Sequence, residues 1–108
     1  MALTELHFEY EGKPECTIQK DWSHTGVVGS GDLEILMEKK DLGGKFAVKV
    51  VTPVTGFDDV WEKVLGKFAQ ETSIGNVSME INDNNGTPFV VGLRLKQAWR
   101  EAGGGDRA

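Results

Sequence analysis

The order of apolar and polar residues along the chain predicts several β-strands. Apolar and polar side chains alternate over residues 6–11 and 77–81, which is the period of a strand with one face buried. Residues 46–53 are rich in β-branched residues and end at a proline, which also indicates a strand. Residues 89–95 alternate in the same way, and the turn-forming residues 83–86 separate them from 77–81. These last two segments are therefore expected to form a β-hairpin.

One long helix is expected at about residues 57–72. Apolar residues recur there every three or four positions and would form one stripe; they are Val60, Trp61, Val64, Leu65 and Phe68. Thr55 and Asp58 have the spacing of a capping box at the start of the helix, and Gly75 sets the limit for its end. Gly66 lies inside the helix, where glycine costs about 1 kcal/mol relative to alanine, so we expect close packing against a strand there.

A small-residue turn, Gly29-Ser30-Gly31, interrupts two strand-like runs at residues 27–28 and 33–38. The pattern predicts a hairpin with this turn at its tip, and a loop or weak edge strand over residues 15–24 before it. Glycine on each side of Ser30 removes side-chain bulk and permits positive φ. The serine hydroxyl should therefore be accessible, although the same residues also suit an ordinary β-turn.

Together these elements predict an α+β fold, a two-layer sandwich. A mostly antiparallel sheet of four to five strands would be covered on one face by the long helix at about 57–72. Residues 96–102 would either prolong the last strand or close with a short helical turn. Residues 103–108 contain three glycines and little to bury, so they are expected to form a flexible C-terminal tail.

Length, charge and cysteine content narrow the class of protein. The 108 residues suffice for one domain. The net charge of −5 comes without a cluster of basic residues, which argues against nucleic acid or an anionic membrane as a partner. Cys16 is the only cysteine, so an intrachain disulfide and a cysteine-based metal site are both excluded. With no run of about 20 apolar residues and no signal peptide pattern, we expect a soluble, cytoplasmic protein.

The residue types of a hydrolase triad occur near the turn, as Ser30, His24 and Asp32. His24 and Asp32 lie too close together along the chain, at or near strand ends, for triad roles to be assigned to them. The turn also lacks the spacing of a nucleophile elbow, a dinucleotide-binding fingerprint or a P-loop. No catalytic and no metal-binding residues are predicted.

Residues 25–34, Thr-Gly-Val-Val-Gly-Ser-Gly-Asp-Leu-Glu, resemble the attachment segment of the acyl carrier (delta) subunit of malonate decarboxylase. They are less similar to the acyl carrier (gamma) subunit of citrate lyase, which has a glutamate where this chain has Gly29. Similarity at Arg94 and Leu95 is weaker. The resemblance implies the element order described above and a single acyl-carrier-type domain over residues 1–102.

The resemblance further implies that Ser30 carries phosphoribosyl-dephospho-coenzyme A, bound covalently through a phosphodiester. The thiol of this phosphopantetheine-type group would hold acetyl or malonyl as a thioester while malonate is converted to acetate and carbon dioxide. Gly29 and Gly31 would leave room around the serine. Asp32 would fix the turn or be read by partner enzymes, or else it only bonds its own backbone.

By the same resemblance the chain is a non-catalytic carrier with protein partners. These are the acyl transferase (malonyl transferase) and decarboxylase subunits of one complex, and a holo-carrier-forming transferase that attaches the group. Two alternatives stay open: a citrate lyase type carrier, and a small non-enzymatic α+β binding module with an ordinary Gly-Ser-Gly turn. Modification of Ser30 would separate both carriers from the binding module.

Overall fold

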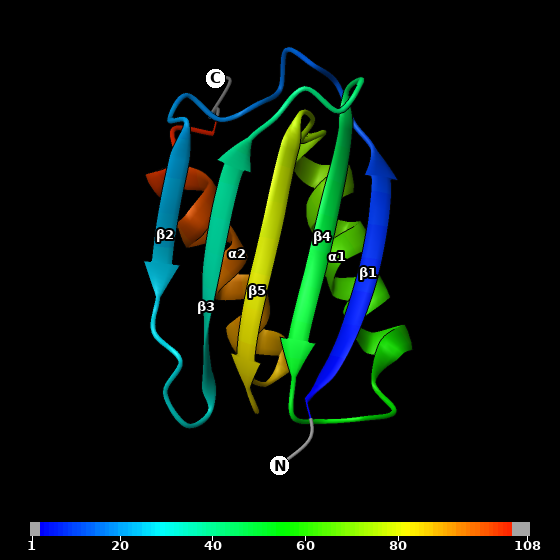
Figure 1. The fold of residues 1–108 in the computed structure, drawn as a ribbon, viewed down its shortest axis with the longest axis vertical. Helices are drawn as coiled ribbons and strands as arrows, with labels where there is room; N and C mark the ends of the chain where they lie inside the picture. The colour runs from blue at the N-terminus through cyan, green and yellow to red at the C-terminus, as the bar shows by residue number, and fades with distance from the viewer. Residues whose placement is uncertain (1–2, 105–108) are drawn as a thin grey trace.

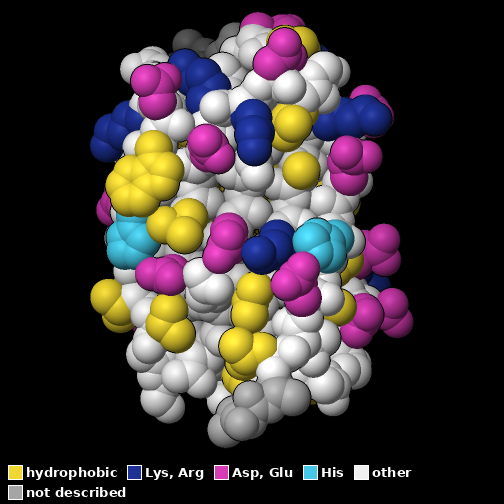
Figure 2. Space-filling model, viewed as in Figure 1, with side chains coloured by type: hydrophobic (Ala, Val, Ile, Leu, Met, Phe, Trp, Pro, Cys, Tyr) yellow, Lys and Arg dark blue, Asp and Glu magenta, His cyan; other side chains and the backbone are white. Residues whose placement is uncertain are grey.

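A five-stranded sheet with two helices packed on one face makes up the fold (Figure 1). The structure is a computed structural model that describes residues 3–104. In chain order the elements are β1 (Thr4–Glu11), β2 (Trp22–Gly26), β3 (Asp32–Lys39), β4 (Lys45–Thr52), α1 (Asp58–Thr72), β5 (Val77–Asn84) and α2 (Pro88–Glu101). The other face of the sheet is open, and acidic and basic side chains are interspersed over it (Figure 2).

The strand order is β1-β4-β5-β3-β2. The pairs β1–β4, β3–β5 and β2–β3 are antiparallel, and β4–β5 is parallel. Parallel neighbours cannot be joined by a tight turn, so the chain passes from β4 to β5 through α1. This crossover brings the carboxyl ends of β4 and β5 to the same end of the molecule as the amino ends of both helices (Figure 1).

The core lies between the sheet and the helices. Every second residue of β3, β4 and β5 is buried against the helices, as the alternating pattern requires. A row of aromatic rings crosses this core from β1 to α2. Ring centroids are 6.0 Å apart for Tyr10 and Phe46, 5.9 Å for Phe46 and Phe68, and 6.1 Å for Phe68 and Trp99.

The expected α+β class and two-layer arrangement are confirmed. So are the strands at 6–11, 46–53 and 77–81, which correspond to β1, β4 and β5. The long helix is α1, which begins and ends within one residue of the expected 57–72.

The predicted capping box of α1 is wrong. Phe57 occupies the N-cap position, and no side chain makes a capping hydrogen bond. Thr55 lies outside the helix because α1 begins only at Asp58. Gly66 also lacks the expected tight contact, since a Cβ there would lie 3.7 Å from Tyr10 Cε1, an ordinary van der Waals distance.

The predicted strand at 89–95 is wrong, and so is the expectation of a single helix. These residues belong to α2, whose first residue is Pro88 and whose N-cap is Thr87. Proline suits the first helical position because its fixed φ is helical and no N–H is lost there. The buried residues Val91, Leu95 and Ala98 follow a helical period, so α2 covers the β2–β3 side of the sheet that α1 leaves open.

The predicted hairpin around Ser30 is confirmed, but its first strand is shifted. Val27 and Val28 lie in the loop and are exposed. The edge strand β2 comes instead from Trp22–Gly26, where the inward residues are Ser23 and Thr25. Because small polar side chains fill the buried positions, the apolar alternation that marks the other strands is missing here.

The expected C-terminal tail is described only at its first two residues. The N–H groups of Gly103 and Gly104 donate to the carbonyls of Arg100 and Trp99 at 3.1 and 2.8 Å; residues 105–108 lie outside the described part of the chain. Neither helix of the described residues is long and apolar enough to cross a membrane.

Candidate functional site

Ser30 lies in the loop that joins β2 to β3, residues 27–31, at one end of the sheet (Figure 1, lower left). The carbonyl of Gly29 accepts a hydrogen bond from the N–H of Asp32 at 3.0 Å, which closes a four-residue turn. Gly31, the third residue of the turn, has φ +77, the backbone conformation of a type II turn, which favours glycine at that position. Its N–H donates to the carbonyl of Asn84 at the end of β5, at 2.7 Å, so the turn is fastened to the sheet.

The Ser30 hydroxyl faces open space. Ser30 is exposed, and within residues 3–104 its side chain has no hydrogen-bond partner. A Cβ placed on Gly31 would meet no atom within 4 Å, and one on Gly29 would meet only Val27 Cγ2, at 3.9 Å. A bulky group bound to the hydroxyl would therefore meet no steric obstacle from the turn.

Asp32 anchors the turn to α2. Its Oδ1 accepts hydrogen bonds from the Leu33 N–H at 2.7 Å and Arg94 Nε at 3.0 Å, and its Oδ2 accepts one from Arg94 Nη2 at 2.7 Å. Two parallel bonds between a guanidinium and a carboxylate are strong and directional. Hydrogen bonding to Arg94, together with the bond from the Leu33 N–H, lowers the pKa of Asp32, and the Asp32 carboxylate raises the pKa of Arg94.

The hydrogen bonds continue from Arg94 along α2 to the other strand of the hairpin. Arg94 Nη1 donates to Gln97 Oε1 at 2.8 Å, and Gln97 Nε2 donates to Glu101 Oε2 at 3.1 Å. Thr25 Oγ1, on β2, donates to Glu101 Oε1 at 2.8 Å. The bonds from Thr25 and Gln97 lower the pKa of Glu101. We call these four residues, together with Asp32, the polar ladder; it holds both ends of the Ser30 loop against one helix.

A family model named ACP, with the description malonate decarboxylase delta subunit (MdcD), matches residues 20–102 of this chain. This range contains the Ser30 loop, the polar ladder and most of the sheet. The chain belongs to the malonate decarboxylase delta subunit family.

Individual members of this delta subunit family are similar over most of their length. The chain is 52% identical over 100 residues to the malonate decarboxylase acyl carrier protein of Malonomonas rubra, which covers 93% of this chain and 89% of that protein. It is 41% identical over 96 residues to the protein of the same name from Acinetobacter calcoaceticus, with 89% and 93% covered.

The fold of this delta subunit family member also matches a solved structure. One chain of a Pseudomonas malonate decarboxylase hetero-tetramer, crystallised in complex with malonate, superposes with a TM-score of 0.82 at 32% identity. The match covers 93% of this chain and 99% of that chain.

The structure brings together Gly29, Ser30, Gly31 and Asp32 as the four residues of one turn. It does not connect Ser30, Asp32 and His24 by hydrogen bonds. His24 Nε2 is 2.8 Å from Glu34 Oε2, and the carboxylate of Asp32 is bound to Arg94. Among residues 3–104 no group of three or more His, Cys, Asp or Glu side chains could hold a metal ion.

Sequence reasoning did not place Arg94, Gln97 or Glu101 at the site in this delta subunit family member. They were missed because residues 89–95 were expected to form a strand, which would send alternate side chains to opposite faces. Their spacing of three and four residues is that of neighbours on one side of a helix. That spacing, after the Thr87-Pro88 start signal, is what could have indicated the ladder.

Proposed function

We propose that this chain carries the acyl group in a malonate decarboxylase, with phosphoribosyl-dephospho-coenzyme A bound covalently to Ser30. The observation that supports this most directly is the exposed Ser30 hydroxyl on a turn that is itself fastened to β5 and α2. In this proposal Gly29 and Gly31 leave room for the group, and Asp32 supports the turn.

The residues at the turn fit a group of this kind. The phosphodiester would form when the Ser30 oxygen attacks the phosphorus of an activated donor and displaces its leaving group, and the space around Ser30 is open to such a donor. Within the described residues the hydroxyl has no partner to accept its proton. The base for the attachment step is therefore assigned to the holo-carrier-forming transferase.

When bound, the group supplies a thiol that holds acetyl or malonyl as a thioester while malonate is converted to acetate and carbon dioxide. The chain contributes a fixed starting point for that group, because the polar ladder ties both strands of the hairpin to α2. Tethering replaces diffusion with a high effective concentration at each active site.

The chemical steps are assigned to partner proteins, so the chain itself is a non-catalytic carrier. Its partners would be the acyl transferase (malonyl transferase) and decarboxylase subunits of one complex. The structural match to one chain of a malonate decarboxylase hetero-tetramer supports such partners.

The test is the intact mass of the chain purified from its native source, followed by peptide mapping across residues 25–34. We expect a mass increase equal to phosphoribosyl-dephospho-coenzyme A, located on Ser30. Ser30→Ala should abolish the increase, and Ser78→Ala, on β5, should retain it. An unmodified Ser30 in cells that contain an active holo-carrier-forming transferase would overturn the proposal and favour a binding module.

A further inference from the structure

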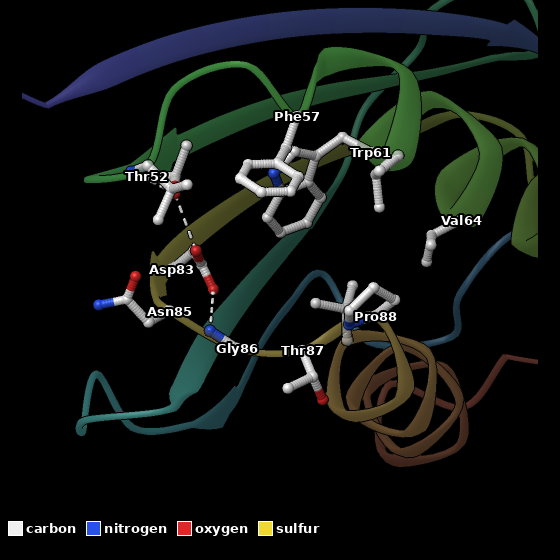
Figure 3. A pocket seen from close by; sticks show the side chains of 12 residues that line it. Thr52, Phe57, Trp61, Val64, Asp83, Asn85, Gly86, Thr87 and Pro88 are labelled. Atoms are coloured by element: carbon white, nitrogen blue, oxygen red, sulfur yellow. Dashed lines mark hydrogen bonds between the residues drawn. The ribbon is translucent and has the colours of Figure 1, made fainter.

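A pocket of about 250 Å³ opens at the end of the molecule where the Ser30 loop lies. It lies between the carboxyl ends of β4 and β5 and the amino ends of α1 and α2. The rings of Phe57 and Trp61 line one side, Thr87 and Pro88 lie across from them, and Asp83 lies near the carboxyl end of β5 (Figure 3). We call it the helix-end pocket.

The helix-end pocket and the Ser30 turn share a wall. Gly31 N–H donates to the carbonyl of Asn84, and the next two residues, Asn85 and Gly86, line the pocket. A Cβ on Gly86 would lie 3.7 Å from the Asp32 carbonyl oxygen. Because neighbouring Cα atoms are about 3.8 Å apart, Ser30 lies within about 15 Å of the pocket wall. A group bound to Ser30 therefore starts close to the pocket.

The mostly apolar lining favours a neutral ring over a phosphate. Asp83 is the one charged residue among the described residues that line the pocket. Its carboxyl oxygens accept hydrogen bonds from Thr52 Oγ1 at 2.8 Å and from the Gly86 N–H at 2.9 Å (Figure 3). Asp58 and Asp59, in the first turn of α1, lie outside the lining. These carboxylates offset the attraction of the helix amino ends for anions, whereas a flat, uncharged ring can stack on an exposed aromatic side chain.

Phe57 provides a second, independent observation. It occupies the N-cap of α1 without a capping hydrogen bond, at a position where Ser, Thr, Asp or Asn would stabilise the helix. Its side chain is also 49% exposed at the rim of the pocket. Because the Phe57 side chain makes no capping hydrogen bond and is half-exposed, its ring is available to contact a ligand.

We infer that the helix-end pocket binds the adenine ring of the group carried on Ser30, by stacking on Phe57. The inference rests on the proposed function. Adenine is the one aromatic ring in dephospho-coenzyme A, and it is neutral at physiological pH. With the ring held in the pocket, the phosphates stay in solvent and the thiol-bearing arm extends from a fixed point at this end of the molecule.

The test uses NMR spectra of the ¹⁵N-labelled full chain, without and with the group on Ser30. Adenosine added to the unloaded chain should give saturable shifts at the Trp61 indole N–H and the Gly86 amide, and pantetheine should not. The loaded chain should show these shifts without added adenosine. Phe57→Ala should weaken adenosine binding about tenfold, as loss of a base-stacking ring does.

Phe89→Ala is the matched control, because Phe89 is also exposed but does not line this pocket; adenosine binding should be unchanged. Shifts caused by pantetheine instead of adenosine would overturn the inference. A confirmed mass increase on Ser30 with unshifted pocket signals would overturn the inference alone. An unmodified Ser30 would overturn the proposed function and the inference together.

Discussion

At the scale of single residues, Asp32 combines two hydrogen-bonding roles that the sequence presents as alternatives. Its Oδ1 accepts from the neighbouring Leu33 N–H, as strand-start aspartates do. The same carboxylate also binds Arg94 through two bonds. A local contact and a contact across 62 positions of the chain therefore fix the residue two positions after Ser30.

The depressed pKa of Asp32 predicts a pH-dependent contribution to stability. The unfolded chain has the ordinary aspartate pKa of about 3.9, and the folded value is lower. The stabilisation by Asp32 is therefore present above about pH 4 and is lost as the pH falls through the folded pKa. The difference in unfolding free energy between the unsubstituted chain and Asp32→Asn should therefore shrink as the pH is lowered. Denaturant titrations at several pH values would measure it.

Asp21→Asn serves as the control, because Asp21 is exposed in the segment before β2 and its carboxyl group makes no hydrogen bond within the described residues. At neutral pH its unfolding free energy should match that of the unsubstituted chain, because no hydrogen bond is removed. A pH-independent difference for Asp32→Asn would show that the pairing with Arg94 does not stabilise the fold.

At the scale of elements, α2 shows where local pattern fails. Residues 89–95 alternate in polarity, yet the positions buried in the structure are Val91, Leu95 and Ala98. Residues 89–95 taken alone are compatible with the period of a strand and with that of a helix. The helical spacing of buried residues continues to Ala102, and this longer pattern favours the helix. Thr87 and Pro88 carry the start signal.

Thr87→Ala tests that start signal. The Thr87 hydroxyl oxygen accepts a hydrogen bond from the Val90 N–H at 3.3 Å, and loss of an N-cap side chain costs about 1 kcal/mol. We expect the unfolding free energy to fall by that amount in a chemical denaturation curve. Thr87→Ser keeps the hydroxyl and should lie near the unsubstituted chain; an equal loss in both variants would show that the methyl group, not the cap, matters.

The sequence predicts best those elements whose buried side chains are apolar. The strands β4 and β5 and the helix α1 bury apolar side chains at the expected period, and β1 partly buries its apolar residues at the same period, so their pattern indicates them directly. The strand β2 buries Ser23 and Thr25, which local pattern cannot distinguish from a loop. The turn residues 29–32 were identifiable because they are consecutive, whereas Arg94 comes to the site only through the tertiary packing of α2.

At the scale of the whole molecule, one aromatic row links the outermost strand to the last helix. Phe46 lies at its centre, fully buried between Tyr10 and Phe68. Because β4 also pairs with both β1 and β5, Phe46 lies where the sheet and α1 meet.

Phe46→Ala should therefore destabilise the fold by about 3–5 kcal/mol, the usual cost of removing a buried phenylalanine ring. Thermal and denaturant unfolding would measure the loss. Phe89→Ala, which removes an exposed ring, should change the unfolding free energy by no more than about 0.5 kcal/mol. Similar losses in the two variants would contradict the placement of Phe46 in the core.

The position of the loop at one end of an elongated molecule has a practical consequence for work with the protein. The principal-axis extents are 39 × 21 × 21 Å, and β1 begins at the same end as Ser30, whereas α2 ends at the opposite one (Figure 1). An affinity tag or fluorophore joined after α2 would stay far from the serine. One joined before β1 would crowd the surface that a modifying enzyme or partner has to reach.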